Sequence, residues 1–437
     1  MPPAGESAVA ATGTTATGAT TRPDAPDVRA LRPHYPCLEG LRTIGVMALF
    51  FQHTGYTTGL QLREGFSWMG HLELGPTMFF VLSAFLLYQP FATANLAERS
   101  AQRFGRFIKG RAFRVIPAYW VTLVLLILFF RADPNNPFSG GIKVDGWKDG
   151  LAIFLFAQTY FPKWFFHGIA SAYTLNAEVV FYLLVPVYAL IVRRWCRGKS
   201  LDQRLRRELG ALLVVAVGSF AYRAFIEWHF QVSRKSCVDA STAKLACAAT
   251  QWFPGYADYF ALGMAVAVIA SWRLVRGEEP RWLQRVGASP DLLWIGALLL
   301  FVGYSTWLGT HGLGYVGPAK SEARHLVNAL IVLFLLLPGV FGNQSRGGVR
   351  HFLQWRPIAY TGLVSYGVYL WHQGFTDKAM TWTNSVPLHA NFVLVTGIAV
   401  GCSIIAATIS WYCLEQPINR RRDVPLRRWL RPLPARS

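Results

Sequence analysis

Residues 173–192 read YTLNAEVVFYLLVPVYALIV, an apolar stretch that carries a single acid, Glu178. A transmembrane helix needs about 20 residues to cross the hydrocarbon core of a bilayer. Fourteen uncharged residues lie on each side of Glu178, over 164–177 and 179–192, so this acid is close to neither loop. An ionisable group within a span is costly to bury and therefore points to a functional site. The stretch indicates both a membrane fold and a place to look for function.

Similar apolar stretches recur along the chain from residue 41 onward. They lie near 41–59, 74–94, 113–130, 173–192, 209–228, 254–272, 291–309, 324–342, 357–375 and 391–413. Hydrophobic residues make up 53% of the 437 residues and charged residues only 15%, whereas soluble domains carry about 25% charge. This composition excludes an ordinary soluble protein, a nucleic-acid binder and a disordered scaffold. We therefore predict an all-α, polytopic integral membrane bundle of about ten transmembrane helices.

The basic residues predict the orientation of this bundle. With the N-terminus inside, the internal segments hold 29 of the 43 Lys and Arg residues and the external segments hold 11. This asymmetry follows the positive-inside rule. A further apolar run, 151–161, has only 11 residues and ends at Pro162, and every later loop would invert if it crossed. We therefore expect it not to cross, and we place the protein in the plasma (inner) membrane with both termini cytoplasmic.

The two ends of the chain differ from its membrane part. Residues 1–36 are rich in Ala, Thr, Gly and Pro, which predicts a disordered cytoplasmic tail. The membrane domain is expected over 37–418, and 419–437 form a basic cytoplasmic tail. The six cysteines are too few for a disulfide scaffold. Cys237 and Cys247 share one predicted external loop, where they could form a disulfide or stay reduced.

Arg42 and His53 lie on one face of the first predicted helix. They are 11 residues apart, which at about 100° per residue is three turns plus roughly 20°. The two residues are separated by roughly 16 Å along the axis, with Arg42 near the cytoplasmic end and His53 in the outer half. Alone, each has an ordinary interpretation, as an arginine that snorkels to the interface and a histidine satisfied in the core. Their common face favours a functional pair.

Arg111 and Arg114 adjoin the cytoplasmic start of the predicted helix 113–130. Their i,i+3 spacing puts them on one face, and guanidinium groups suit phosphate because they present paired donors in a fixed plane. As part of a basic cluster they could equally be ordinary positive-inside flanking residues. The pair is therefore a candidate phosphate-binding site rather than a certain one.

Ser365, Tyr369 and His372 share a face of the predicted helix 357–375. A histidine near an outer helix end among aromatic residues is usually an interface residue, so this group is a weaker candidate. The sequence contains no P-loop, no Gly-x-Ser-x-Gly elbow and no His-x-x-x-His pair. ATP hydrolysis, serine-hydrolase chemistry and a local zinc site are therefore unsupported, and we expect no metal.

Taken in order, these segments resemble the integral membrane acyltransferase family 3. The resemblance covers roughly residues 35–422. Ala84 stands where the family usually has Gly, and Asn176 and Val179 replace more usual residues around Glu178. The matching segments are Leu38–Arg42 with His53 (Arg-x10-His), Phe79–Phe85 (Phe-Phe-x-x-Ser-Gly-Phe), Arg111–Tyr119 (Arg-x-x-Arg-Ile-x-Pro), Thr174–Tyr182 (Ser-Leu-x-x-Glu-x-x-Phe-Tyr), Ser365–His372 (Ser-Tyr-x-x-Tyr-Leu-x-His) and Leu414–Pro417 (Glu-x-Pro).

The resemblance implies an O-acyltransferase that takes an acyl group from cytoplasmic acyl-CoA, acetyl-CoA or a similar donor. The acceptor would be a hydroxyl of a cell-envelope carbohydrate, a glycolipid or a small molecule such as an antibiotic. Arg111 and Arg114 would bind the donor together with Ser83 and Phe80. Membrane lipids are implied as partners, and nucleic acid is not. Some members carry an added extracytoplasmic hydrolase-like domain; with 15 residues after Arg422, we expect this chain to act without one or with a partner.

The resemblance also assigns catalytic roles to His53, Arg42 and Glu178. His53 suits a general base, because an imidazole with an ordinary pKa near 6.5 can accept a proton from a hydroxyl at neutral pH. Arg42 could hold the donor or pair with Glu178. Glu178 could orient His53 or Arg42, or serve only as the structural partner of a buried charge. These alternatives stay open at the level of sequence.

Two other classes of function are compatible with the buried charges. A transporter of an acylated or anionic substrate could use Arg, Glu and His without any chemistry, but it predicts internal repeat symmetry, and the two halves of this chain carry different motifs. A membrane-embedded interaction partner would not need Arg42 and His53 on one face. The enzyme is therefore the leading hypothesis.

Overall fold

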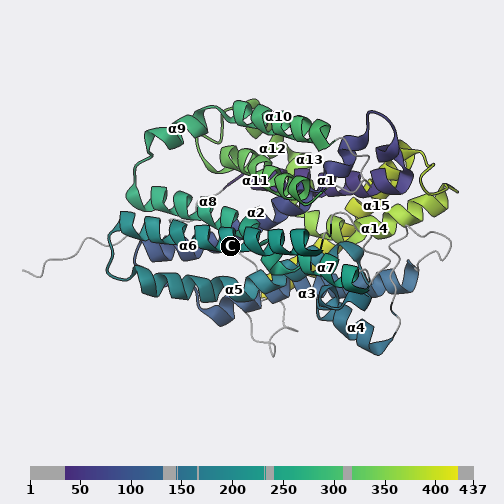
Figure 1. Cartoon of the computed structure of the whole chain (residues 1–437), viewed down its shortest axis with the longest axis horizontal. Helices are drawn as coiled ribbons and strands as arrows, with labels where there is room; N and C mark the ends of the chain where they lie inside the picture. The colour runs from purple at the N-terminus through teal and green to yellow at the C-terminus, as the bar shows by residue number, and fades with distance from the viewer. Residues whose placement is uncertain are drawn as a thin grey trace, which may run out of the picture. The chain divides into compact units, whose positions relative to one another are not determined.

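The described part of the chain is a bundle of helices. A computed structural model describes residues 35–130, 144, 146–164, 167–230, 232, 241–308 and 317–421. Within these ranges all regular structure is helical (Figure 1). Eight helices among the described residues are long and apolar enough to cross a membrane. The chain is therefore an integral membrane protein with several spans, and its all-α class agrees with the prediction from sequence.

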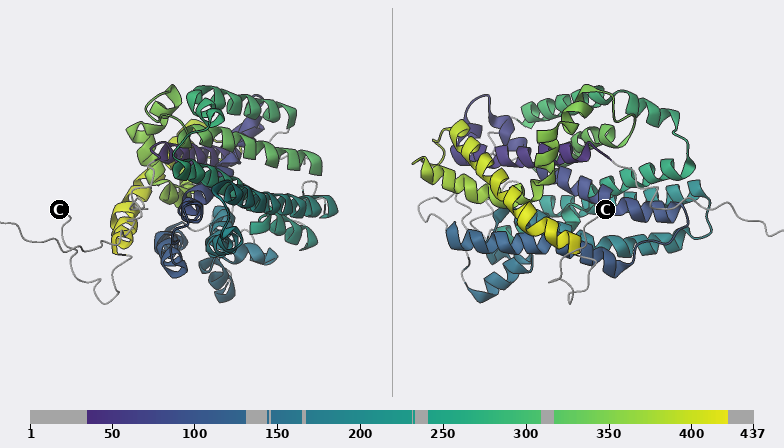
Figure 2. Two further views of the ribbon diagram at one scale, coloured as in Figure 1. Left: turned by 90° about the vertical axis from the view of Figure 1, so that its left-hand side faces the viewer. Right: turned by 180° about the vertical axis from the view of Figure 1, so that it is seen from behind.

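The eight membrane-length helices each fall on a predicted apolar stretch. The first runs from Ser67 to Leu96 and includes α2, Leu74–Leu96. The others are α3 (Phe104–Phe129), α5 (Tyr173–Cys196), α6 (Leu201–Phe230), α8 (Ala257–Arg276), α10 (Pro290–Leu308), α11 (Pro318–Val340) and α15 (Phe392–Ser410). Figure 2 shows α15 running on through a π-helical turn, Trp411–Glu415, into α16, Gln416–Arg421.

The other two predicted stretches are helical but differ from a plain apolar span. Residues 41–59 lie in α1, Leu38–Thr58, which carries Glu39, Arg42 and His53 and does not reach the hydropathy of the eight. Residues 357–375 are two helices, α13 (Arg356–Leu363) and α14 (Ser365–Trp382), with the break at Val364. Ten crossings therefore stay a prediction, of which eight helices meet the requirements of length and hydropathy.

The short run 151–161 does not form a membrane-length helix. Its first part lies in α4, Trp147–Phe154, and 3-10 turns follow at Gln158–Tyr160 and Pro162–Trp164. Eight helical residues cover only about 12 Å, less than half of the hydrocarbon core. The Tyr119 hydroxyl donates to the Ile153 carbonyl at 3.0 Å, which fixes α4 against the side of α3. The run is therefore too short to cross as one helix, and the expectation that it does not cross stays a prediction.

The connections group at two ends of the bundle. The links between α5 and α6 and between α8 and the short α9 (Arg281–Ala288) lie at one end, whereas α4 and the link between α14 and α15 lie at the other (Figure 1). This grouping matches the internal and external segments expected from the charge pattern. Which end faces the cytoplasm stays a prediction. Two further short helices are α7 (Ser241–Thr250) and α12 (Gly348–Gln354).

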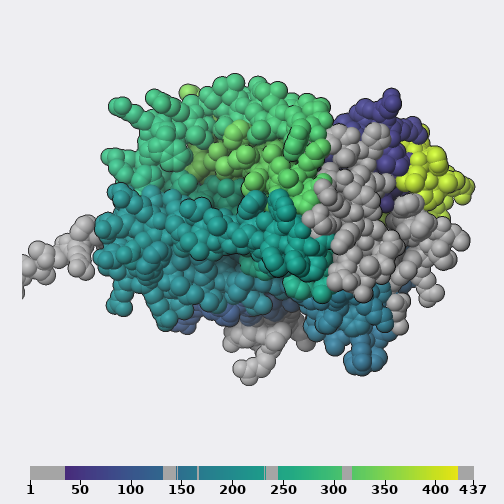
Figure 3. Space-filling model, in the orientation of Figure 1, coloured from purple at the N-terminus to yellow at the C-terminus, as the bar shows by residue number. Residues whose placement is uncertain are grey.

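Helix α2 forms the centre of the bundle. In an apolar stretch of 18 residues of the helix that includes α2, 72% of the residues are buried. The same share is 17% for α6, which lies on the front face in Figure 3. Helix α8 packs closely along α2, because Gly263 has no side chain: a Cβ there would meet the Val81 carbonyl and come within 2.8 Å of Ala84 Cβ. The alanine at position 84 is thus accommodated by a glycine on the facing helix.

Some predictions fall on residues that lie outside the described ranges. These are most of the N-terminal tail 1–36, the C-terminal residues 422–437 and Cys237. Cys247 is disulfide-bonded, whereas Cys37, Cys196, Cys402 and Cys413 are free. Of the two alternatives left open for Cys237 and Cys247, a reduced Cys247 is excluded in this structure, whereas Cys237 lies outside the described residues.

Candidate active site

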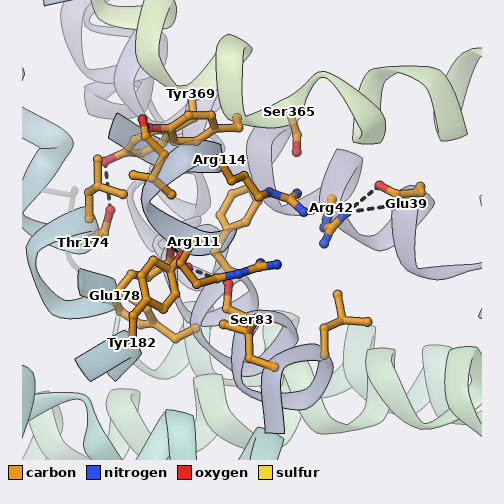
Figure 4. A pocket seen from close by; sticks show the side chains of 17 residues that line it. Glu39, Arg42, Ser83, Arg111, Arg114, Thr174, Glu178, Tyr182, Ser365 and Tyr369 are labelled. Atoms are coloured by element: carbon orange, nitrogen blue, oxygen red, sulfur yellow. Dashed lines mark hydrogen bonds and ion pairs between the residues drawn. The ribbon is translucent and has the colours of Figure 1, made fainter. Parts of the chain in front are cut away.

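A cavity of about 370 Å³ lies between α1, α2, α3, α5 and α14. We call it the arginine cavity, because Figure 4 shows the side chains of Arg42, Arg111 and Arg114 turned toward the same space. Two acids, Glu39 and Glu178, also line it, so its lining carries one more positive than negative formal charge. The other lining residues are Phe79, Phe80, Ser83, Leu86, Leu87, Val115, Thr174, Leu175, Tyr182, Ser365, Tyr366 and Tyr369.

Arg42 is held at the wall of the cavity by its own helix. Its Nη1 donates to both carboxylate oxygens of Glu39, at 2.8 and 2.7 Å, an i,i+3 pair. The Arg42 side chain is 16% exposed. Helix α1 is fixed at this end because the Thr43 hydroxyl donates to the Ile358 carbonyl of α13 at 2.5 Å. The guanidinium therefore has a defined direction toward the cavity, with donor groups that Glu39 does not occupy.

Glu178 has partners that the sequence did not indicate. Its carboxylate accepts from the Ser83 hydroxyl of α2 at 2.6 Å and from the Tyr182 hydroxyl one turn along α5 at 2.7 Å. Pairing of Glu178 with Arg42 or His53, as considered from sequence, is not found among the described hydrogen bonds. Arg42 has a nearer acid in Glu39, and His53 has a different partner. The carboxylate is thus fixed by two neutral donors.

Arg111 and Arg114 come from the first half of α3. One turn of helix separates them, so both reach the cavity from the same side. The Tyr366 hydroxyl donates to the Val115 carbonyl at 2.9 Å, which ties this part of α3 to α14. Planar guanidinium groups present paired donors that match phosphate oxygens. Three such groups around one cavity form a suitable receptor for a ligand that carries several phosphates.

His53 forms a hydrogen-bonded pair with His372 of α14. The distance between His53 Nδ1 and His372 Nε2 is 2.8 Å, and the two ring planes differ by 17°. His372 Nδ1 lies 2.5 Å from the Tyr369 carbonyl, which can only accept, so this nitrogen carries the proton. In the neutral pair His372 Nε2 then accepts and His53 Nδ1 donates. The remaining nitrogen, His53 Nε2, is left with its lone pair as a proton acceptor.

Tyr369 connects the histidine pair with the arginine cavity. Its side chain lines the cavity, and its backbone carbonyl holds His372 one turn away. The Tyr369 hydroxyl lies 2.8 Å from the Thr174 hydroxyl and donates to the Ser171 carbonyl at 2.6 Å, so that α14 is tied to the start of α5. His53 and His372 are not among the described residues that line the arginine cavity. They lie just beyond its Tyr369 wall.

The structure thus sorts the residues chosen from sequence into two groups. Six of them line the arginine cavity: Arg42, Phe80, Ser83, Arg111, Arg114 and Glu178. The seventh, His53, is in the neighbouring histidine pair. Of the weaker group on α14, Ser365 and Tyr369 line the cavity and His372 is the partner of His53. This last contact makes His372 more than an interface residue, and its position on one face with Tyr369 was the signal for it.

The two departures around Glu178 do not disturb that residue. Asn176 points to another neighbour, because its side-chain amide donates to the Thr159 hydroxyl. Neither Asn176 nor Val179 lines the arginine cavity. Tyr182, which sequence analysis did not select, is the residue that holds Glu178, and its i,i+4 spacing on α5 was the available signal. Among the described residues no group of three His, Cys, Asp or Glu side chains could hold a metal ion.

Comparison with known proteins agrees with this arrangement. The profile of a family described as an acyltransferase domain matches residues 35–409. The chain belongs to the acyltransferase 3 family. All of the residues around the arginine cavity and the histidine pair lie within the matched range. The family is one of membrane acyltransferases.

Several curated proteins are distant relatives of this chain. A peptidoglycan O-acetyltransferase of Listeria monocytogenes is 22% identical over 413 residues, which are 90% of this chain and 57% of that protein. A putative peptidoglycan O-acetyltransferase of Bacillus subtilis is 22% identical, over 88% of this chain and 55% of its own length. Nodulation protein 10 of Rhizobium leguminosarum is 23% identical, over 80% of this chain and 82% of its own length. The chain thus spans little more than half the length of the first two relatives. No solved structure matches.

Proposed function

We propose that the protein is an O-acyltransferase that moves an acyl group from cytoplasmic acyl-CoA to a hydroxyl of a cell-envelope carbohydrate or glycolipid. The observation that carries this proposal is the hydrogen-bond chain from the Tyr369 carbonyl through His372 to His53. It leaves one imidazole nitrogen ready to take a proton, beside a cavity suited to phosphate. Base and anion receptor together are what acyl transfer from a CoA thioester to an alcohol requires.

The donor is assigned to the arginine cavity. Arg42, Arg111 and Arg114 would bind the phosphates of the CoA part, while Ser83 and Phe80 line the inner side of the same cavity. Glu178 holds Ser83 and Tyr182 in place through its two hydrogen bonds, and so acts as a positioning residue in this proposal. Arg42 and His53 lie on one helix at a separation of about 16 Å. The flexible arm of the donor would bridge that distance.

The chemistry follows from the tautomer of the histidine pair. His53 Nε2 accepts the proton of the acceptor hydroxyl as its oxygen attacks the thioester carbon. The new C–O bond forms, the C–S bond breaks, and the proton on His53 passes to the departing thiolate to give free CoA. His372 keeps accepting from His53 Nδ1 throughout, so it holds the ring in one orientation and supports its positive charge.

Family membership fixes the acyltransferase class, and the finer statements rest on the charge pattern and the cavity. These finer statements are the acyl-CoA donor, the envelope acceptor, an inner-membrane location with both termini cytoplasmic, and an acyltransferase domain over 37–418 flanked by tails. The related proteins named for peptidoglycan O-acetylation support a glycan acceptor. Acetyl is the acyl group that their names suggest for this chain.

Turnover by the purified full-length protein tests the proposal. In lipid nanodiscs we expect release of free thiol from acetyl-CoA that rises when envelope glycan fragments are added. Mass spectrometry of the glycan should then show an added acetyl mass that is removed by mild base, as an O-ester is. Acetyl-pantetheine as donor should support turnover at a lower affinity, because it lacks all of the phosphates of CoA. Absence of both thiol release and acetylated product would exclude this function.

A further inference from the structure

A second polar cavity lies on the other side of α2. It has a volume of about 110 Å³ and is lined by residues from five helices, α2, α5, α6, α8 and α11, and from the segments that precede them. Among them are Glu73, Arg223, Tyr256, Arg324, His325 and Asn328. We call it the outer cavity, because it is at the end of the bundle that the charge pattern places outside. Sequence analysis selected none of these residues. None of the polar ones lines the arginine cavity.

Arg223 of α6 is the central cation of the outer cavity. Its Nε lies 3.1 Å from Glu322 Oε1 of α11, and its Nη2 lies 3.9 Å from Glu227 one turn along α6. The side chains of these three residues are 11%, 4% and 5% exposed. The Ser321 hydroxyl donates to Glu227 at 3.1 Å. This group therefore holds two carboxylates and one guanidinium away from water.

His325 of α11 is held between two residues of α8. Its Nε2 lies 2.6 Å from Asp258 Oδ2, and its Nδ1 lies 2.8 Å from the Tyr259 hydroxyl. The Ser219 hydroxyl of α6 approaches the other oxygen of Asp258 at 3.1 Å. Three helices are thus connected through one imidazole and one carboxylate. The wall of the cavity that they form is fixed in place.

The polar residues become more exposed toward one side of the cavity. Arg324 and Glu73, paired at 2.8 Å, are 26% and 32% exposed. His325 is only 4% exposed and Asn328 only 2%. A ligand would therefore enter past the Arg324–Glu73 pair and meet the buried groups behind it.

Two buried acceptor oxygens at this site have neither a hydrogen-bond partner nor an ion-pair partner among the described residues. They are Oδ1 of Asn328 and Oε2 of Glu322. The Asn328 amide nitrogen is used, since it donates to Glu73 at 3.3 Å, so the amide is anchored while its oxygen is left over. A buried acceptor without a partner costs roughly 1–3 kcal/mol. Asn328 lines the cavity, and a ligand that donates a hydrogen bond there would satisfy it.

The burial of so many charges is poorly explained by stability alone. Replacing a buried ion pair by apolar residues is often neutral or stabilising, and in a membrane span ionisable residues mark a site by default. Both arginines of the cavity are compensated by acids, Arg324 by Glu73 in the lining and Arg223 by Glu227 and Glu322 behind the lining. Neither arginine is therefore left without an acid that an anion would replace, and the cavity offers closely spaced donors and acceptors. That pattern suits the hydroxyl groups of a neutral sugar.

We infer that the outer cavity binds the acceptor, as a neutral, hydroxyl-bearing sugar ring. This inference rests on the proposed function and adds where, and in what form, the acceptor is held. A volume of about 110 Å³ corresponds to roughly four waters at about 30 Å³ each, which is room for one polar edge of a ring. Tyr256 and Phe80, whose ring centres are 4.9 Å apart, give an apolar wall for its C–H face.

The outer cavity also borders the arginine cavity directly. Phe80 lines both cavities, and the consecutive residues Tyr173 and Thr174 line the outer cavity and the arginine cavity, respectively. Thr174 in turn contacts Tyr369, whose carbonyl holds His372. An acceptor in the outer cavity is thus separated from the histidine pair by the start of α5 and by Phe80.

Direct binding of simple sugars tests this inference without any acyl donor. The full-length protein in nanodiscs is mixed with the methyl β-glycosides of glucose, galactose and N-acetylglucosamine, and saturation-transfer NMR reports contact with the ring protons. We expect a signal for at least one of the three. Asn328→Leu should weaken the binding of that sugar at least tenfold, because the substitution removes the unpartnered oxygen and nearly keeps the volume of the side chain. Arg324→Gln, at the exposed side of the cavity, should weaken the binding of the sugar severalfold and leave the protein folded.

Asn95→Leu is the matched control. Asn95 is also a buried amide that donates to a glutamate, Glu208, but it lies at the other end of α2 and lines neither cavity. The Asn95→Leu variant should bind the sugar with the same affinity as the wild type. Absence of signal for all three glycosides, or unchanged binding in both Asn328→Leu and Arg324→Gln, would overturn the inference. Sugar binding without thioester turnover in the same sample would instead exclude the proposed function and leave the sugar site standing.

Discussion

The arginine cavity and the outer cavity differ in the balance of their charges. Three arginines and two glutamates line the first. Two arginines and Glu73 line the second, and Glu227 and Glu322, which pair with Arg223, lie behind its lining. In the arginine cavity Arg42 pairs with Glu39 of its own helix. In the outer cavity both arginines are paired with acids of other segments. Under the two proposals, buried charge serves two ends in one bundle: a cluster of three guanidinium groups would attract phosphate, and a compensated network would arrange hydrogen bonds for hydroxyl groups.

The comparison depends first on the two cavities facing opposite sides of the membrane. We expect a cysteine at Ser200 to be protected from a membrane-impermeant maleimide on intact cells, and a cysteine at Ala319 to be labelled. Both positions are exposed, and Ala319 is in the first turn of α11, near Arg324. The protein without an engineered cysteine serves as the control, because any labelling of it comes from the native cysteines. Labelling at both positions, or at Ser200 alone, would contradict the orientation, and labelling in permeabilised cells shows that Ser200 is reachable.

Removal of the base should have the largest effect on chemistry. We expect His53→Ala to lower acyl transfer at least ~100-fold, since general-base catalysis contributes about 10²–10⁴, while binding of sugar and acyl-CoA persists. His372→Ala should lower the rate less, because His53 keeps its lone pair but loses the partner that fixes its ring. Turnover is measured with a thermal melt of each variant. His229→Ala, an exposed histidine of α6, is the control, and wild-type turnover in His53→Ala would remove this residue from the mechanism.

Exchange of arginine for lysine should separate the two cavities by their ligands. Arg111→Lys and Arg114→Lys are each expected to raise the KM for acetyl-CoA about tenfold, because an ammonium cannot make a bidentate phosphate contact. The KM for acetyl-pantetheine and the binding of methyl glycosides should change little. Arg106→Lys, on the exposed part of α3, controls for the loss of a nearby guanidinium. Equal losses with both donors would indicate a disturbed fold instead of a lost phosphate contact.

The close packing of α8 against α2 at Gly263 gives the prediction with the smallest expected effect. Gly263→Ala should lower the stability by about 1–3 kcal/mol, the usual range for overpacking, because the added Cβ meets the backbone of α2. The melting temperature in detergent is the measurement. Gly218→Ala on α6 is the matched control, since a Cβ at that position has nothing within 4 Å. A melting temperature for Gly263→Ala that equals or exceeds that of the control would show that α2 and α8 are packed less tightly than described.

Sequence was sufficient for those features that depend on local composition. The stretch 173–192 predicted α5 almost to the residue, because an apolar run of that length has one favourable structure in a membrane. The break at Val364 was missed, since the surrounding residues are as apolar as those of a continuous span. The convergence of Arg42, Arg111 and Arg114 could be expected from their common place near the cytoplasmic ends of two helices.

Partners across helices could not be predicted in the same way. Whether Glu178 meets Ser83 or Arg42 depends on the rotation of α2 and α1 about their axes, which periodicity does not fix. The outer cavity escaped notice because its charges come singly, from positions as far apart as Glu73, Arg223 and Glu322. Each of them reads as an ordinary polar residue near the end of a helix. Only the packing of four helices brings them together.

Phe80 and its neighbours have a consequence for the electrical integrity of the membrane. The Phe80 ring is fully buried, with Tyr256 and Phe260 each 4.9 Å from it between ring centres. Narrow apolar constrictions of this kind exclude water and so block the passage of ions. In the orientation that the charge pattern predicts, the arginine cavity opens to one side of the membrane and the outer cavity to the other, and the membrane potential would fall mainly across this thin layer of rings. An enzyme with the proposed function reaches both sides of a bilayer and must also insulate them, and three aromatic side chains would supply that insulation.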